Sequence, residues 1–349
     1  MDKAKSTEKN KKFPWGIILK TLSFIIITLA ILIIGLYSVM WVVVKGPSPT
    51  AKQLFVRSVK ETSAIGFFAN IYLSNEEIAE IMGEGKQENK QEQTDTSLIS
   101  IKKPETLAGE NPAEGDKPAQ KDLELLDIKG PSFKGKLMII KDPQRTFLAT
   151  TQSYGGAGEQ LASMVERTGA IAGVNGGGFD DPGGGGQGGI PEGIVIRDGQ
   201  LLSSDAVNAK GYWTAVMDKK GILHVGWMTG YQAAEKDANW AVSFGPVLVQ
   251  NGKKFDGLNS GLNPRTAVGQ REDGAVLLLV IEGRHVDSLG ATCSDIADIM
   301  LQYGAVNAMN LDGGSSSAMI YNGEQITSIA SVVGVRPIPT AILVKQVSG

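Results

Sequence analysis

Residues 21–44 contain no charged side chain and consist mostly of isoleucine, leucine and valine. An apolar run of this length spans the hydrocarbon core of a bilayer as a helix. Trp15, Tyr37 and Trp41 lie toward its ends, where interfacial aromatic residues concentrate. The apolar region of a cleaved signal peptide is shorter, about 7–15 residues, and ends at a small-residue cleavage site. The sequence therefore predicts an uncleaved transmembrane anchor over residues 15–45.

The charges before this run set its orientation. Residues 1–12 carry five lysines and two acidic side chains. Because lysine-rich flanks stay in the cytoplasm, we expect residues 1–14 to form a cytoplasmic tail. Everything after Lys45 is then extracytoplasmic, in a single-pass protein of the cell membrane.

Net charge and cysteine content argue against a nucleic-acid partner and an intrachain disulfide. The formal net charge is −3, which gives no electrostatic footprint for nucleic acid, so we expect no nucleic-acid partner. The single cysteine, Cys293, excludes an intrachain disulfide. That usage suits a cytosolic protein and equally a bacterial surface protein that does not use disulfides, and the predicted anchor favours the second.

A helical spacer and a linker separate the anchor from the rest. Residues 46–82 carry apolar side chains at helical spacing, and Ser74 followed by Glu77 predicts a capping box. Residues 83–125 are rich in charged, polar, glycine and proline residues, which predicts a disordered linker. Residues 126–349 then form the globular domain.

Within that domain, apolar runs alternate with turn signals and end in two glycine-rich loops. Helices are predicted over 158–168 and from Thr292 onward, closed by Gly169 and Gly304. The expected strands and hairpin turns are 137–140, 146–149, 170–174, 193–197, 213–217, 222–225, 241–252, 265–269 and 276–281, with turns at Asp198-Gly199, Lys220-Gly221, Asn251-Gly252 and Asp273-Gly274.

The two loops follow similar units of helix, glycine and strand. The first, residues 175–189, reads NGGGFDDPGGGGQGG, and the second contains DGGSSS at residues 312–317. Glycine at this density provides either a mobile lid or a backbone cradle for a ligand. The side chains that the first loop offers are Asn175, Phe179, Asp180 and Asp181. The weak repeat places Asn175 in register with Asn310 and suggests that both loops face one cleft.

Several motifs in a fixed order carry a family resemblance. They are NGGGF, GPVLVQNG, NPRTAVG, VIEGR, a T-x-x-D helix start, NAMNLDGGSSSAM and VRPIPTAI. Over residues 130–347 the chain resembles the phosphodiester glycosidase family, although DGR is replaced by Glu282-Gly283-Arg284 and NGGFF by NGGGF. The resemblance implies an α+β domain with packed helices around a mixed, largely antiparallel sheet. It also implies hydrolysis of a sugar-1-phosphodiester.

Glycosidic cleavage uses two carboxylates that flank the anomeric centre. The hypothesis gives the catalytic work to Asp312 and Glu282, which stand at the ends of apolar strands. Asp180 and Asp181 are further candidates, and His285 is either an acid or base or an exposed bystander.

The phosphodiester anion calls for paired donors, which arginine supplies. Arg265 and Arg284 are the predicted clamps. The remaining predicted substrate contacts come from the two loops: Asn175, Gly176, Gly177, Phe179, Asn310, Gly313, Gly314, Ser315 and Ser316.

No spacing of histidine, cysteine and acidic residues requires a metal, so no cofactor is expected to be needed, although carboxylates and loop carbonyls are compatible with a divalent cation. The expected partners are the membrane and a phosphodiester-linked glycan of the envelope or an extracellular polysaccharide. The alternative is a non-catalytic glycan-binding or exopolysaccharide assembly factor on the same fold. Charged residues at strand ends and a low aromatic content, 6%, favour the enzyme.

Overall fold

The structure is a computed structural model that describes residues 15–62, 65–83, 93–101, 122–180, 188–202, 210–329 and 334–347. The chain divides into two compact units, Met1–Phe55 and Val56–Gly349. The second unit thus takes in most of the predicted helical spacer as well as the predicted domain. The predicted boundaries at residues 82 and 125 stay predictions.

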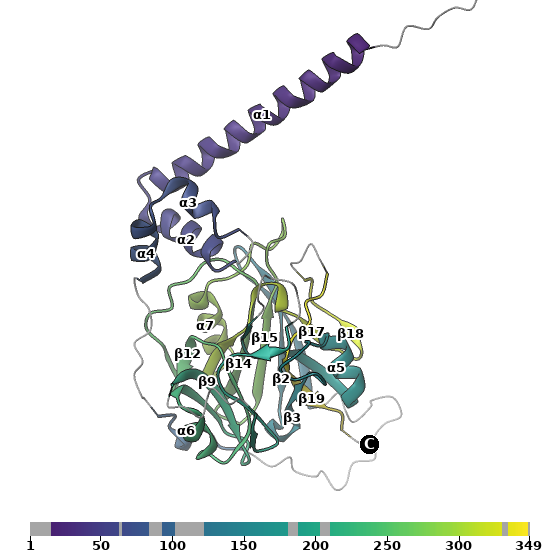
Figure 1. The fold of residues 1–349 in the computed structure, drawn as a ribbon. Coiled ribbons are helices and arrows are strands. Elements are labelled where there is room, and N and C mark those ends of the chain that lie inside the picture. The colour runs from purple at the N-terminus through teal and green to yellow at the C-terminus, as the bar shows by residue number, and fades with distance from the viewer. Residues whose placement is uncertain are drawn as a thin grey trace, which may run out of the picture. The chain divides into compact units, whose positions relative to one another are not determined.

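The first unit contains helix α1, Trp15–Lys45, which is 31 residues long (Figure 1). Its side chains are almost all exposed, and Val44 is its buried residue. By length and composition α1 is able to cross a membrane. Helix α2, Pro49–Lys60, begins in this unit and ends in the next.

Two short helices follow α2, namely α3, Phe68–Tyr72, and α4, Asn75–Gly83. The predicted capping box at the start of α4 is confirmed. The Glu77 N–H donates to Ser74 Oγ at 3.2 Å, and the Ser74 N–H donates to Glu77 Oε2 at 2.9 Å. This exchange satisfies two of the backbone donors that a helix start leaves unpaired.

Three antiparallel sheets form the body of the second unit, which confirms the α+β class. The seven-stranded sheet has the order β1 (Leu123–Lys129), β2 (Lys134–Ile140), β15 (Val276–Ile281), β14 (Arg265–Arg271), β16 (Ala305–Leu311), β12 (Val247–Gln250) and β13 (Lys253–Lys254). One five-stranded sheet has the order β10 (Leu223–Met228), β9 (Tyr212–Asp218), β11 (Ala238–Ser243), β7 (Val195–Arg197) and β8 (Gln200–Leu201). The other has β18 (Glu324–Gln325), β17 (Met319–Tyr321), β4 (Ala170–Asn175), β19 (Thr340–Lys345) and β3 (Thr146–Thr150).

Every strand pair of the described residues is antiparallel, so the sheets are not mixed. A small hairpin, β5 (Phe179–Asp180) with β6 (Ile190–Pro191), stands apart from the three sheets. The predicted hairpin turns at Asp198, Lys220 and Asp273 connect β7–β8, β9–β10 and β14–β15 as expected.

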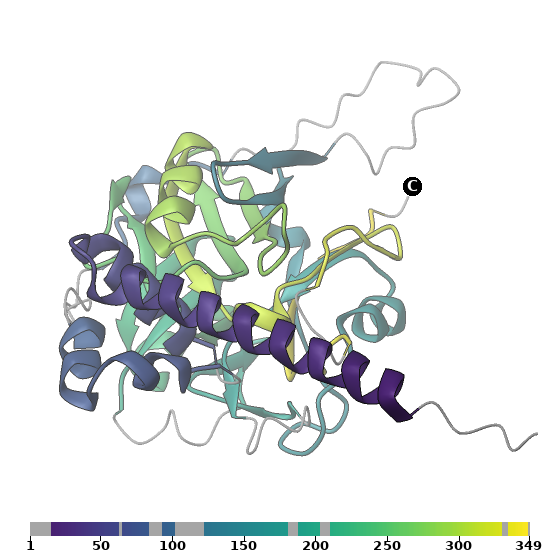
Figure 2. The ribbon, with the colours of Figure 1, turned by 90° about the horizontal axis from the view of Figure 1, so that it is seen from above.

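The helices cover separate flanks of the sheets, as Figures 1 and 2 show for α5 and α7. Helix α7, Cys293–Gln302, packs Ile296, Ala297 and Met300 on the seven-stranded sheet. Helix α5, Leu161–Thr168, packs Met164 and Val165 on the sheet of β3, β4 and β19. Each of the larger buried side chains among these, from valine to methionine, contributes roughly 1.5–3 kcal/mol. The third helix of this body, α6, is Gly230–Ala234.

Both long helices of the body end as predicted, and α7 also begins as predicted, whereas α5 begins at Leu161, three residues after the predicted start at 158. Gly169 closes α5 in the left-handed conformation at φ +66°, and Gly304 follows α7 at φ +83°. Thr292 and Asp295 form the predicted capping box of α7. Local sequence chemistry decides these features, which explains why they were predictable.

The apolar run at 241–252 differs from the prediction of one strand. It contains the end of β11 and all of β12, and these belong to two different sheets. The break lies at Phe244-Gly245-Pro246, where Gly245 has φ +96°. An apolar run has the same composition whether its residues belong to one strand or to strands of two sheets, so composition could not show where β11 ends and β12 begins.

One segment of the predicted linker is ordered. Residues 93–101 include a short 3-10 helix, Thr96–Leu98, and bind the strand turns of the body. The Asp95 N–H donates to Asn251 Oδ1 at 2.8 Å, and the Ser100 N–H donates to the Glu272 carbonyl at 2.7 Å. The prediction of disorder therefore fails for these nine residues, and residues 84–92 and 102–121 lie outside the described parts.

Candidate active site

The ends of several strands from all three sheets meet at one rim of the second unit. Strand register brings Arg265 opposite Ile281, Thr266 opposite Leu311 and Ala341 opposite Asn175. We call this place the rim, and it is defined by Asn175, Ser243, Arg265, Ile281, Leu311 and Thr340. Both predicted loops start there, because Gly176 follows β4 and Asp312 follows β16.

Asn175 connects the sheets across the rim. Its Oδ1 accepts hydrogen bonds from Thr266 Oγ1 at 2.7 Å and from the Ala318 N–H at 3.2 Å. Its Nδ2 donates to the Asp312 carbonyl at 2.6 Å. Asn175 is 1% exposed, and these contacts position the second loop; its contact with substrate stays a prediction. The two loops are therefore in direct contact, and the contact is made by the hydrogen bonds of the Asn175 amide.

The glycines after Asn175 allow very close backbone contact. A Cβ on Gly176 would lie 2.5 Å from Thr340 Oγ1, and one on Gly177 would lie 2.6 Å from the Ser243 carbonyl. The Gly177 N–H donates to Thr340 Oγ1 at 3.1 Å, and the Gly178 N–H donates to the Ser243 carbonyl at 2.9 Å. These two N–H groups are therefore used in hydrogen bonds within the protein. The glycines are needed here for space.

Asp312 lies where the two loops meet. Its N–H donates to the Gly176 carbonyl at 3.2 Å, and its Oδ1 accepts from the Gly313 N–H at 2.9 Å. Burial raises the pKa of Asp312 to about 6, and the negative charge of Glu192 adds to the rise. The Ser316 hydroxyl, the positive charge of Arg336 and the Gly313 N–H oppose it. The carboxyl group is thus poised to exchange a proton near neutral pH.

The DGGSSS loop presents buried polar atoms that lack partners. Gly314–Ser316 forms a 3-10 turn, and the Gly314 N–H donates to the Pro264 carbonyl at 2.9 Å. Asp312 Oδ2, Ser316 Oγ and Ser317 Oγ have no hydrogen-bond partner of good geometry among the described residues. Buried polar atoms are normally satisfied, so a group of three within one loop is typical of a place that receives a ligand or water. Gly313, Gly314 and Ser315 in the same loop are half-buried.

Two charged residues near Asp312 were missed by the sequence analysis. Glu192 follows β6, and its N–H donates to the Gly178 carbonyl at 2.9 Å. Arg336 precedes β19, and its guanidinium carbon lies 4.5 Å from the centre of the Phe179 ring. The VRPIPTAI motif contains Arg336 and was a signal for it, whereas no pattern in the sequence singled out Glu192.

The predicted phosphate clamps are engaged with the chain itself. Arg265 is 7% exposed, and its Nη2 donates to Glu61 Oε2 at 2.7 Å and to the Gly261 carbonyl at 2.8 Å. Arg284 Nη2 donates to Thr62 Oγ1 at 2.9 Å and to Asn263 Oδ1 at 3.1 Å. A substrate anion at Arg265 would have to displace these partners, so the clamp stays a prediction.

The second predicted carboxylate is held on the far side of β14 from Asp312. Glu282 is 7% exposed, its Oε1 accepts from the Ser328 N–H at 2.9 Å, and its Oε2 lies 3.6 Å from Lys134 Nζ. The strand order β15-β14-β16 places one strand between the ends that carry Glu282 and Asp312. The structure therefore groups Asp312 with Glu192. The catalytic role of Glu282 stays a prediction.

The other predicted residues are spread around the rim. Asn310 is 1% exposed and its Nδ2 donates to the Gly245 carbonyl at 2.8 Å. His285 Nε2 is buried with no hydrogen-bond partner among the described residues. Asp180 is exposed in β5, and Asp181 lies outside the described residues.

The arrangement of side chains also bears on a metal site. Among the described residues, no group of three or more His, Cys, Asp or Glu side chains is arranged to hold an ion. Whether a cation takes part stays a prediction.

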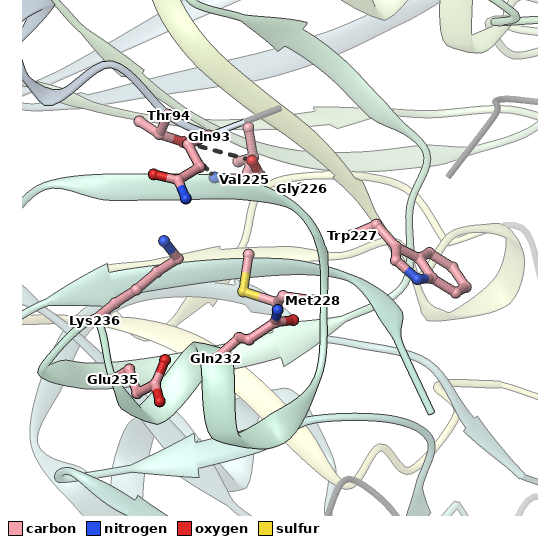
Figure 3. A pocket seen from close by; sticks show the side chains of 9 residues that line it. All are labelled: Gln93, Thr94, Val225, Gly226, Trp227, Met228, Gln232, Glu235 and Lys236. Carbon is pink, nitrogen blue, oxygen red and sulfur yellow. Dashed lines mark hydrogen bonds between the residues drawn. The ribbon is translucent and has the colours of Figure 1, made fainter. Parts of the chain in front are cut away.

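A pocket of about 330 Å³ lies elsewhere, on β10 and α6 (Figure 3). Thr94 bridges its wall by accepting from the Val225 N–H at 3.1 Å. Its lining contains no rim residue, and its charged side chains, Glu235 and Lys236, have opposite signs. Three orphaned polar atoms and the perturbed carboxyl lie in the loop of Asp312, so we place the candidate active site at the rim and not in this pocket.

Known proteins are similar to this chain in sequence. A prophage-derived uncharacterized protein of Bacillus subtilis, YomE, is 30% identical over 205 residues, which is 54% of this chain and 29% of that protein. The mouse N-acetylglucosamine-1-phosphodiester alpha-N-acetylglucosaminidase is 27% identical over 226 residues, 56% of this chain and 41% of that protein. The chain thus spans less than half the length of these relatives.

Two solved structures share the fold. The catalytic domain of the zebrafish N-acetylglucosamine-1-phosphodiester alpha-N-acetylglucosaminidase, described as auto-inhibited by its pro-peptide, matches with a TM-score of 0.53 and 19% identity, over 64% of this chain and 82% of that one. A hypothetical protein from Synechocystis matches with a TM-score of 0.51 and 16% identity, over 64% of this chain and 61% of that one. The sequence model of the phosphodiester glycosidases matches residues 168–345, which include both loops, Asp312 and Arg336. The chain belongs to the phosphodiester glycosidase family.

Proposed function

We propose that this protein is a membrane-anchored extracytoplasmic hydrolase that cleaves the sugar–phosphate glycosidic bond of a sugar-1-phosphodiester. Its substrate would be part of a cell-envelope or extracellular polysaccharide. The observation that carries the proposal is Asp312, a half-buried residue whose Oδ2 is buried without a hydrogen-bond partner of good geometry among the described residues, and whose pKa is raised to about 6. The family relatives named for this chemistry support the reaction class.

In this reaction, water adds to C1 of the sugar, and the bond from C1 to the bridging oxygen breaks with its electron pair going to that oxygen. Protonated Asp312 is suited to donate the proton that the leaving phosphate takes up, and water restores it. The products are a free sugar and a phosphomonoester. A raised pKa is what a general acid needs near neutral pH, and it results here from burial.

The proposed location of the protein rests on α1 and on the charges before it. A helix of 31 residues with exposed apolar side chains supports a membrane anchor. The lysines of residues 1–12 support a cytoplasmic N-terminus, which leaves the rim outside the cell membrane, where envelope polymers are found.

The test uses the full-length protein in detergent with UDP-N-acetylglucosamine and with wall-polymer fragments. We expect release of free reducing sugar, with kcat/KM falling as pH rises through about 6 because Asp312 loses its proton. Asp312→Asn should lack activity at every pH. Full activity of Asp312→Asn would reject the assignment. Tight binding of the polymer without release of sugar would support the non-catalytic alternative.

A further inference from the structure

The end of α2 and the two residues after it bind the loop that leads into β14. The Leu262 N–H donates to Ser58 Oγ at 2.9 Å, and the Gly261 N–H donates to Glu61 Oε1 at 2.9 Å. A Cβ on Gly261 would lie 2.2 Å from the Ser58 nitrogen, so the two backbones are in direct contact. All of these residues belong to the second unit. We call Ser58–Thr62 the docked segment.

The loop before β14 also contacts the DGGSSS loop. The Pro264 carbonyl accepts from the Gly314 N–H at 2.9 Å, and a Cβ on Gly313 would lie 2.8 Å from the same oxygen. In the DGGSSS loop, Ser316 Oγ and Ser317 Oγ are buried without a hydrogen-bond partner of good geometry among the described residues. The docked segment is thus connected through a single loop to polar atoms that are suited to receive a ligand.

Glu61 and Thr62 each hold one of the two arginines. Glu61 Oε2 accepts from Arg265 Nη2 at 2.7 Å, so the charge of this 7% exposed arginine is balanced by a carboxylate. Thr62 Oγ1 accepts from Arg284 Nη2 at 2.9 Å, and Asn263 Oδ1 accepts from the same nitrogen at 3.1 Å. Both of these oxygens are neutral, so they orient Arg284 without balancing its charge.

Arg284 lies against the DGGSSS loop. The residue is exposed, and a Cβ on Gly314 would lie 3.4 Å from its Nη2 and 3.6 Å from its Nη1. Its Nη1 and Nε have no hydrogen-bond partner in the parts of the chain that the structure describes. Its φ is +59°, a conformation that residues with a Cβ rarely adopt outside functional sites and turns. The protein therefore fixes one nitrogen of the guanidinium and leaves the other two as donors for an anion.

We propose that Thr62 is a positioning residue of the active site, which holds Arg284 beside the DGGSSS loop so that this arginine binds the phosphodiester anion of the substrate. This inference rests on the proposed function. The docked segment lies before residues 168–345, which the family model matches, so Thr62 is a feature of this chain outside the family domain. The segment that follows the anchor is then part of the active site, and residues 126–349 alone form an incomplete one.

The experiment compares full-length wild type, Thr62→Val and Thr62→Ser with UDP-N-acetylglucosamine as the substrate. Thr62→Val keeps the shape of the side chain and removes the oxygen that Arg284 binds. We expect it to raise KM about 10-fold and to change kcat less than about 3-fold, because the diester is anionic both when bound and in the transition state. Thr62→Ser returns the hydroxyl and should restore KM to within about 3-fold of the wild-type value.

Thr168→Val is the matched control. The Thr168 hydroxyl donates to the Met164 carbonyl four residues earlier at 2.8 Å, as the Thr62 hydroxyl does to the Ser58 carbonyl at 3.0 Å. Thr168 ends α5 and precedes the start of β4, whereas the rim is at the other end of that strand. We therefore expect KM and kcat of Thr168→Val to stay within about 2-fold of wild type. Glu61→Gln is unsuitable as a test, because it leaves a buried arginine unpaired and destabilises the fold.

Binding separates this inference from the proposed function. We expect UDP-N-acetylglucosamine, titrated calorimetrically into Asp312→Asn, to bind about 10-fold more weakly when Thr62→Val is added. If wild type binds this diester and does not hydrolyse it, the proposed function fails while the binding comparison still tests Thr62.

Four results would overturn the inference. The first three are unchanged KM and binding in Thr62→Val, a rise in KM that Thr62→Ser does not reverse, and absence of diester binding by the wild type. The fourth is a lower KM in Thr62→Val, because the docked segment would then compete with the substrate for Arg284 instead of positioning it.

Discussion

Burial turns Asp312 from an ordinary carboxyl into a group that exchanges protons near pH 6. The rise comes from loss of solvation, and the three groups that stabilise the ionised form only partly cancel it. The same burial costs stability, because the folded protein must hold a charge that the unfolded chain solvates well. Asp312 therefore links activity and stability through one proton.

This link predicts that Asp312→Asn stabilises the protein at pH 7.5 while abolishing activity. The folded pKa, about 6, lies above the ordinary value of 3.8, so the folded state binds more protons in that window. Wild-type stability should fall as pH rises from about 4 to about 6, and the variant should gain about 1–3 kcal/mol above it. Urea unfolding at pH 4.5 and 7.5 measures this. A variant that is less stable at pH 7.5 would contradict the burial argument.

Single-residue contacts also distinguish Glu192 from Glu282 as the second carboxylate that acts with Asp312. Glu192 acts on the charge of Asp312, whereas Glu282 binds the Ser328 N–H and lies 3.6 Å from Lys134 Nζ. We expect Glu192→Gln to lower kcat for the diester by about 10²-fold or more with little change in stability. Glu282→Gln should lower the free energy of unfolding by about 1–3 kcal/mol. Kinetics combined with urea unfolding separates the two. A larger loss of kcat in a well-folded Glu282→Gln variant would instead support Glu282 as the second catalytic carboxylate.

Among the elements, the loop after β4 shows how glycine fixes geometry. A Cβ on Gly177 would meet the Ser243 carbonyl at 2.6 Å and Val242 Cβ at 3.2 Å. Because backbone cannot move aside as a flexible side chain does, the loop must shift away from β11 if Gly177 is replaced. The Asn175 amide precedes this glycine by two residues, so such a shift also disturbs Asp312.

We therefore expect Gly177→Ala to cost about 2–4 kcal/mol of stability and most of the activity. Gly83→Ala is the matched control, because it adds the same methyl group at the end of α4 with nothing within 4 Å. It should change stability by no more than about 1 kcal/mol. Thermal unfolding and reducing-sugar release measure both effects. An active, stable Gly177→Ala protein would show that the close packing of this loop is dispensable.

At the scale of the whole molecule, α1 predicts where the protein is found. Its 31 residues and exposed apolar face should keep the protein in membranes after alkaline carbonate washing. Protease added to intact cells, with the outer layers permeabilised, should digest the C-terminal domain and leave a small membrane fragment. A mature protein whose N-terminus begins after Lys45 would instead identify a cleaved signal sequence.

Local and periodic features could be predicted from the sequence alone. The capping boxes at Ser74 and Thr292, the closure of α5 by Gly169 and the hairpin turns each depend on a few neighbouring residues. Short-range sterics and hydrogen bonds decide them, and the structure confirms them. Asp312 and its loop were singled out from an apolar strand that ends in a carboxylate and glycines, and their role in a site stays a prediction.

Only the tertiary structure decided which charged residues lie close to Asp312. Asp312, Glu192 and Arg336 are more than a hundred residues apart at the extremes, and strand order and loop packing bring them together. The same applies to Glu61, which binds Arg265 across 204 positions of sequence. The sequence determined most of the α+β elements and a helix long and apolar enough to span a membrane, and it pointed to one carboxylate, because each is encoded locally. The partners of that carboxylate depend on long-range contacts, which no local pattern encodes.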